Sequence, residues 1–184
     1  PNGFLEIPHG KEKEFLWRYA GYFKINPFPK GFDTGAINIR AVKTQGSALS
    51  FVVEGADQTL LKVSLLKPLA PGEKIDVAMD FDVKIPNAYG RFGFNENIIT
   101  LSHWYPILCV ANADGTWNKN PFYPFHRPFF SESALYAVRL KVSADEVVIH
   151  SGQLKEEKKE QGNLKILSIG TSSPIREFSL ALSP

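Results

Sequence analysis

Four histidines are the side chains of this chain with the clearest capacity to bind a metal or to transfer a proton. They are His9, His103, His126 and His150. No two of them have the spacing of H-E-x-x-H, which puts two imidazoles on one face of a helix where they can hold zinc. A zinc site would need these scattered positions together with a single cysteine, so we expect ordinary surface or hydrogen-bonding histidines and no metal site.

A hydrolytic triad could be sought in Ser102, His103 and Asp114, because these are the residue types of nucleophilic catalysis. Adjacent residues of a strand point to opposite faces, so Ser102 and His103 are not expected to face each other. Cys109 lies in the apolar segment Ile107–Val110, where it is expected to pack as a small hydrophobic residue. No G-x-S-x-G motif and no phosphate-binding glycine loop occurs. We therefore predict no catalytic residue in this chain.

The elements that would position these side chains are predicted to be strands. The clearest is Lys74–Lys84, in which Ile75, Val77, Met79, Phe81 and Val83 alternate with charged or small residues. Further segments with the same period of two are 37–41, 49–53, 61–65, 136–142, 164–168 and 178–182, and 147–149 is a short apolar run. Their spacing predicts an all-β fold, either a β-sandwich or an open curved sheet.

Two segments depart from this pattern. Lys11–Phe23 carries apolar residues at helical spacing and is expected to form at most one short helix. Tyr89–Trp117 combines aromatic and turn residues and is predicted to be a long aromatic loop, the kind of segment that carries function on a rigid scaffold. The whole chain, 1–184, is expected to be a single domain.

The charge pattern argues against a nucleic-acid partner. The formal net charge is +2, and lysines and glutamates are mixed rather than gathered in a basic stripe. The densest charged run, Lys155–Glu160, alternates in sign and is expected to be a solvated hairpin loop. No apolar run approaches the roughly 20 residues of a membrane span, so none is expected in this segment. The single cysteine excludes an intrachain disulfide and leaves every compartment open.

Several segments resemble the N-terminal β-domain of the M1 family of zinc metallopeptidases. Thr59–Pro86 resembles the segment of that domain with the pattern L-x-V-x-L-x-x-P-L-x-P-G-E. The segments that resemble a bacterial branch of the family are Arg91–Gly93, His103–Pro106, Gly115–Asn118, Pro128–Glu132 and Ala137–Val142. The resemblance covers roughly residues 36–182 and is most specific in the middle of the chain.

The resemblance implies that the chain is a non-catalytic N-terminal fragment of a zinc-dependent aminopeptidase. The resemblance also implies an antiparallel β-sandwich or saddle-shaped curved sheet for this domain. In that family a helical catalytic domain follows, with H-E-x-x-H and G-x-M-E-N motifs that are absent from this sequence. Pro1–Phe4 resembles the exit from the early strands, and Arg176–Ser183 the transition to the catalytic domain. The expected partners are the chain's own catalytic domain and the amino terminus of a peptide substrate. No cofactor is expected in the fragment, and zinc is expected in the missing domain.

The resemblance also suggests site residues. Many members of the family use a Gln or Glu of this domain to bind the α-ammonium of the substrate, and the corresponding positions are Asn95, Glu96 and Asn97. Asn stands here where the family has Gln. Asn97 could offer an amide oxygen and Glu96 a charge, whereas the alternative is that the three residues form a turn.

The aromatic side chains of the same region admit two interpretations. They could line the substrate side of a cleft or pack in the core beneath the loop. The aromatic residues concerned are Phe92, Phe94, Trp104 and Tyr105. A second aromatic loop, Pro121–Pro128 with His126, could face the catalytic domain.

Two other functions fit the sequence. The chain could be a scaffold or binding module, either an inactive relative of the M1 enzymes or a free-standing β-sandwich that binds protein or carbohydrate. It could also be a self-contained hydrolase, which would need titratable groups gathered in one pocket around Glu96, His103 and His126.

Overall fold

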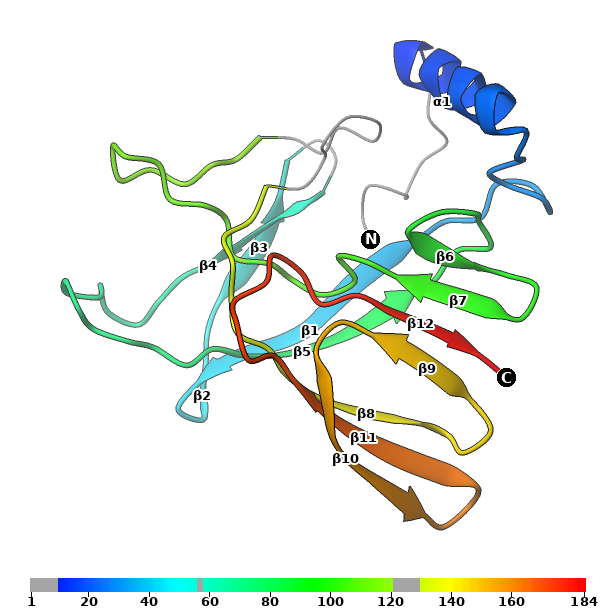
Figure 1. Ribbon diagram of the computed structural model, residues 1–184. Coiled ribbons are helices and arrows are strands. Elements are labelled where there is room, and N and C mark those ends of the chain that lie inside the picture. The colour runs from blue at the N-terminus through cyan, green and yellow to red at the C-terminus, as the bar shows by residue number, and fades with distance from the viewer. Residues whose placement is uncertain (1–9, 56–57, 121–129) are drawn as a thin grey trace.

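The computed structural model describes residues 10–55, 58–120 and 130–184 and shows an antiparallel β-sandwich with one helix (Figure 1). The all-β class and the single short helix predicted from the sequence are confirmed. The predictions for Pro1–Phe4, Pro121–Pro128, His9 and His126 lie outside the described residues. The elements are α1 (Gly10–Phe23), β1 (Ala36–Thr44), β2 (Ser47–Ala48), β3 (Phe51–Glu54), β4 (Leu60–Val63), β5 (Ala78–Lys84), β6 (Phe92–Asn95), β7 (Ile98–Leu101), β8 (Ala137–Ser143), β9 (Val147–His150), β10 (Gln153–Glu160), β11 (Leu164–Gly170) and β12 (Leu180–Ser183).

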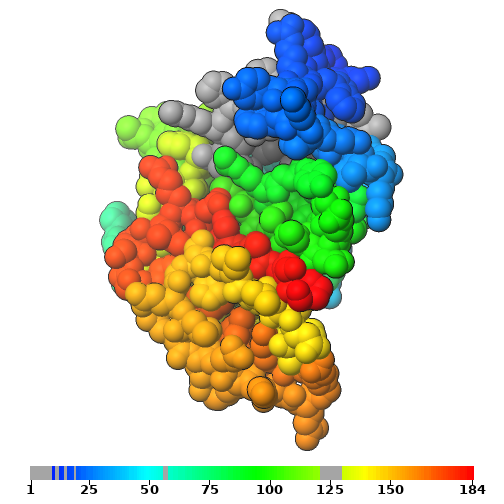
Figure 2. Space-filling view, turned by 45° about the vertical axis from the view of Figure 1, so that its right-hand side comes forward, coloured from blue at the N-terminus to red at the C-terminus, as the bar shows by residue number. Residues whose placement is uncertain are grey.

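Helix α1 forms where the apolar spacing predicts it. It ends because Lys24 takes a left-handed conformation with φ of 53°. The Lys24 amide then donates to the Gly21 carbonyl at 3.3 Å, and the Ile25 amide donates to the Ala20 carbonyl at 3.0 Å, which is the Schellman pattern. Figures 1 and 2 show the helix at one end of the molecule, opposite the β10–β11 hairpin.

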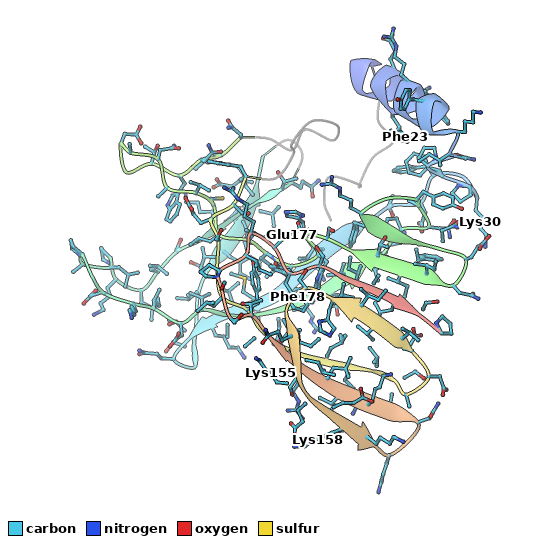
Figure 3. All side chains as sticks on the ribbon, in the orientation of Figure 1. Phe23, Lys30, Lys155, Lys158, Glu177 and Phe178 are labelled. Carbon is cyan, nitrogen blue, oxygen red and sulfur yellow. The ribbon has the colours of Figure 1, made fainter. Side chains whose placement is uncertain are left out.

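The centre of the molecule lies between two sheets that pack face to face. One sheet has the strand order β10-β11-β8 and the other β6-β7-β12-β9. Their inner faces share a core of Leu167 and Ile169 from β11, Leu180 from β12 and the fully buried Phe178. Figure 3 shows Phe178 at the centre of the molecule. Alternating side chains of both sheets thus bury their apolar face against each other, which is what stabilises a sandwich.

Strand β5 is shorter than the predicted strand Lys74–Lys84. The strand begins at Ala78, and Val77 is exposed rather than buried. The reason is that β5 pairs with β1 only as far as Lys43, which faces Ala78. Beyond that residue β1 turns back into its hairpin with β2, so residues 74–77 have no partner strand. The alternating burial is kept where the partner exists.

Two predicted loops contain strands. Tyr89–Trp117 is not a continuous loop, because β6 and β7 form a hairpin inside it. Lys155–Glu160 is not a hairpin loop but part of β10, which pairs with β11 along its length. All eight residues of β10 are exposed, so the strand shows no apolar alternation in the sequence. Backbone pairing with β11 forms this strand without an apolar side-chain pattern.

Candidate functional site

Asn95, Glu96 and Asn97 lie at the tip of the β6–β7 hairpin. Asn95 pairs with Ile98, so Glu96 and Asn97 form a two-residue turn. Glu96 has φ of 51°, and both turn residues are exposed. Glu96 and Asn97 are thus turn residues, whereas Asn95 is the last residue of β6. The turn also presents a carboxylate and a side-chain amide to solvent, groups that can accept hydrogen bonds from an ammonium group.

The turn borders an exposed apolar face, the outer side of the β6-β7-β12-β9 sheet. Cross-strand pairing places Ile149 beside Ala181 and Ala181 beside Thr100, all on the side away from the core. Ile98, Val147 and Ile149 are 55%, 61% and 71% exposed. Large apolar side chains gathered on one face are typical of a surface that another protein part covers.

A polar cluster of Ser102, His103, Glu177 and Ser179 lies at the other end of the β6–β7 hairpin. The Nδ1 atom of His103 contacts one carboxylate oxygen of Glu177, and the Ser179 hydroxyl donates to the other. The Oγ atoms of Ser102 and Ser179 are 3.2 Å apart. Figure 3 shows Glu177 next to Phe178. The side chain of His103 is largely buried, and its backbone has φ of 52°.

The polar cluster joins two distant segments rather than forming a triad. The Ser179 hydroxyl and the imidazole both contact the Glu177 carboxylate, and the Ser102 hydroxyl contacts Ser179. Neither serine is thus arranged as a nucleophile activated by His103. Asp114 instead accepts hydrogen bonds from the amide and hydroxyl of Thr116, at 2.9 and 2.6 Å. Asp114 therefore lies outside the polar cluster that contains Ser102 and His103. Sequence reasoning missed Glu177 and Ser179, because they lie more than 70 residues from their partners.

Burial lowers the pKa of His103 below its usual value. The negative charge of Glu177 opposes this shift, and the positive charge of Arg91 adds to it. The neutral imidazole can donate its Nδ1 proton to the carboxylate, so the buried group keeps a hydrogen bond without carrying a charge.

This environment predicts that the protein loses stability as the pH falls below about 6.5, the ordinary histidine pKa. In that range the unfolded chain binds a proton at residue 103 more readily than the folded chain, so acid favours unfolding. Equilibrium urea unfolding at several pH values between 8 and 5 measures how the free energy of unfolding changes with pH, and this change is the slope. His103→Asn, in which Asn tolerates the left-handed backbone, is expected to remove most of it.

The pH range of the effect distinguishes His103 from the carboxyl groups, which titrate at lower pH. A hydrogen bond from Lys84 is the main reason why the pKa of Asp33 lies below its ordinary value, and a hydrogen bond from Thr116 does the same for the pKa of Asp114. Their contribution is present above the ordinary carboxyl pKa of about 4 and is lost only at lower pH. An unchanged slope between pH 8 and pH 5 in His103→Asn would show that another group is responsible.

The aromatic residues after β7 pack in the core. The Phe178 amide donates to the Tyr105 hydroxyl oxygen at 2.8 Å, and burial raises the pKa of Tyr105. Trp104 stacks edge-on against Tyr105 with ring centroids 5.2 Å apart, and both pack on the core. Phe92 is buried as well. For these residues core packing, rather than a cleft wall, is the correct interpretation.

The described part of the chain offers no donor set for zinc. Within residues 10–55, 58–120 and 130–184, no three His, Cys, Asp or Glu side chains come together in a group that could hold a metal ion. His103 and Glu177 contact each other, and no third His, Cys, Asp or Glu of the described residues joins them in such a group. In the same residues, no helix is both long and apolar enough to cross a membrane.

No protein-family model matches the chain, and no curated protein matches its sequence. Solved structures do match. A point mutant of the M1 zinc metallopeptidase from Deinococcus radiodurans is similar with a TM-score of 0.52 and 17% identity, over 80% of this chain and 32% of that chain. The M1 zinc metallopeptidase from the same organism without the mutation has a TM-score of 0.49 and 16% identity, over the same shares of both chains.

A third similar structure is a two-domain M1 zinc metallopeptidase mutant bound to L-tryptophan, with a TM-score of 0.48 and 20% identity. The match covers 80% of this chain and 33% of that one. This chain thus spans about a third of the length of these structures. The described β-sandwich has the fold of the N-terminal domain of the M1 zinc metallopeptidases.

Proposed function

We propose that this chain is the N-terminal β-domain of an M1-type zinc aminopeptidase, a hydrolase of the bacterial branch. In this role it walls one side of the substrate cleft and packs on a helical catalytic domain. The observation that carries the proposal is the shared fold with the Deinococcus radiodurans enzyme. The sequence motifs around Thr59–Pro86 and Arg91–Gly93 support the same family independently of the fold.

The exposed apolar face supports packing against a further domain. Ile98, Val147 and Ile149 would cost free energy in water, at about 25 cal/mol for each Å² of apolar surface left exposed. A catalytic domain on this face would remove that cost. The end of β12 lies beside β7, since Leu182 pairs with Ile99, so the face and the Glu96–Asn97 turn are contiguous.

The exposed turn supports a contact with the substrate amino terminus. An α-ammonium group has three donors and seeks oxygen acceptors of neutral or negative character. Asn97 and Glu96 offer both kinds at the edge of the proposed packing face, and the half-buried Asn95 anchors the turn. The zinc ion would be held by residues of the catalytic domain and would supply the activated water.

The prediction that tests this proposal is made on the full-length protein that contains this chain. Asn97→Ala is expected to lower kcat/KM for an aminoacyl substrate roughly tenfold, because one charge-assisted hydrogen bond contributes about 1.5–3 kcal/mol. Steady-state hydrolysis of an aminoacyl chromogenic substrate, with and without zinc chelation, gives the measurement.

The matched control is Asn38→Ala, since Asn38 is exposed on β1, which belongs to a different sheet from the turn. Its kcat/KM is expected to stay within twofold of the parent protein. Equal kcat/KM values for the Asn97 and Asn38 variants would contradict a contact between the turn and the substrate. A full-length protein without H-E-x-x-H and without zinc-dependent hydrolysis would contradict the peptidase role as a whole.

A further inference from the structure

A shallow groove lies on the outer face of the β10-β11-β8 sheet, on the side away from the core. Its volume is about 360 Å³. Three of its lining residues, Ala137, Ser168 and Gly170, are small, and Gly170 and Ser168 stand next to Ala137 and Arg139 on the neighbouring strand. Small side chains on adjacent strands leave the groove open, and the flanking residues Arg139 and Lys155 come from the two strands on either side of β11.

A β-bulge directs Lys155 over this groove. Leu154 pairs with Ile169 and Glu156 with Ser168, so Lys155 is the extra residue between them. Its aliphatic chain crosses Gly170, because a Cβ atom placed on that glycine would lie 3.4 Å from the Lys155 Cε atom. The ammonium group donates to the side-chain oxygen of Gln153 at 2.8 Å. Figure 3 shows Lys155 nearer the centre of the molecule than Lys158.

The charges on this face are not balanced at the groove. Lys141 pairs with Glu160, and Lys158 pairs with Glu156 at 3.0 Å. Arg139 and Lys155 form no salt bridge with any carboxylate among the described residues. On this face, Arg139 and Lys155 are therefore the two described cations without a carboxylate partner, and both flank the groove.

We propose that this groove binds a phosphate or sulfate group. Arg139 offers a planar fork of donors, Lys155 a point charge, and Ser168 a hydroxyl, from three adjacent strands. A tetrahedral oxyanion can accept hydrogen bonds from three directions, whereas the two oxygens of a carboxylate lie in one plane. The apolar lining beside these donors also accommodates a small organic body attached to the oxyanion. This site is separate from the Asn95–Asn97 turn and does not depend on the proposed peptidase role.

The test is an NMR titration of the ¹⁵N-labelled 184-residue chain at pH 7.5 and constant ionic strength. The probes are inorganic phosphate, sodium sulfate and phenyl phosphate. We expect saturable shifts of the Ala137, Ser168 and Gly170 amides. Tighter binding of phenyl phosphate than of inorganic phosphate would identify an ester as the source of the oxyanion, and the reverse order would identify the free ion.

Two variants and a matched control decide whether the groove or the general charge binds the probe. Arg139→Gln and Lys155→Gln are each expected to weaken binding roughly fivefold, in line with partly exposed ion pairs. Lys158→Gln removes the same charge from the same strand and is expected to weaken it less than twofold. Equal weakening by all three variants, or shifts that fail to saturate, would overturn the proposal. All three side chains are exposed, and the dispersion of the amide spectrum verifies that each variant is folded.

Discussion

Phe178→Ala is expected to lower the free energy of unfolding by about 3–5 kcal/mol, the cost of removing a large side chain from a packed core. Phe178 is 0% exposed and lies between the two sheets of the sandwich. Its ring stacks on His150 with centroids 6.5 Å apart and contacts Tyr136 at 6.0 Å. No single neighbour can fill the volume, because the surrounding side chains belong to strands of two different sheets.

The measurement is equilibrium unfolding in urea, with the slope of the transition compared between variants. The matched control is Phe130→Ala, since Phe130 is 62% exposed. Its effect is expected to stay within about 0.5 kcal/mol. Similar small losses for both variants would contradict a core located between the β10-β11-β8 and β6-β7-β12-β9 sheets.

Gly93→Ala is expected to destabilise the protein by about 1–3 kcal/mol or more, as overpacking does. A Cβ atom on Gly93 would lie 2.4 Å from the carbonyl oxygen of Ala88. That carbonyl cannot move away easily, because its segment is held to β6 by two backbone hydrogen bonds. The Ala88 amide donates to the Phe94 carbonyl at 3.1 Å, and the Phe94 amide donates to the Pro86 carbonyl at 2.9 Å.

Gly21→Ala is the internal control for this glycine, and its expected effect has the opposite sign. Gly21 lies inside α1, and a Cβ atom there would contact nothing within 4 Å. Alanine in a helix interior is more stable than glycine by roughly 0.5–1 kcal/mol. Thermal and urea unfolding of both variants measure the difference. A neutral Gly93→Ala variant would contradict the close approach of Ala88.

The close approach of Ala88 to Gly93 and the polar cluster are both relevant to the proposed function. Gly93 fixes β6 against the segment before it, and the polar cluster fixes the end of the β6–β7 hairpin to the segment that enters β12. The exposed Glu96–Asn97 turn therefore projects from a hairpin that is held at its base. A site on a rigid element keeps its geometry better than one on a free loop.

Sequence patterns predicted the elements whose burial is local. Segments 136–142 and 164–168, which have a period of two, form β8 and β11. Alternate side chains of a strand face the same side, so this pattern does not depend on where the partner strand lies. The short helix at Lys11–Phe23 was predicted from apolar residues at helical spacing. The motif around Arg91–Gly93 pointed to the M1 β-domain fold, and the close approach of Ala88 to Gly93 explains why glycine suits that position.

Sequence patterns did not predict features that depend on partner strands or distant residues. Strand β5 begins only at Ala78, opposite the point where β1 turns away, which no pattern inside Lys74–Lys84 reveals. Strand β10 has no buried face, so its charged run resembles a loop. The Gly and Asn residues of β6 resemble turn residues, yet pairing with β7 makes them a strand.

The amino-acid sequence alone determined the β class, the position of the helix and the candidate residues Asn95, Glu96 and Asn97. Only the tertiary structure decided that His103 contacts Glu177 and that Ser102 contacts Ser179. It also decided that Arg139 and Lys155 flank one groove. The physical reason is that periodicity records which side of an element faces the core, while contacts between side chains many residues apart depend on strand order and register.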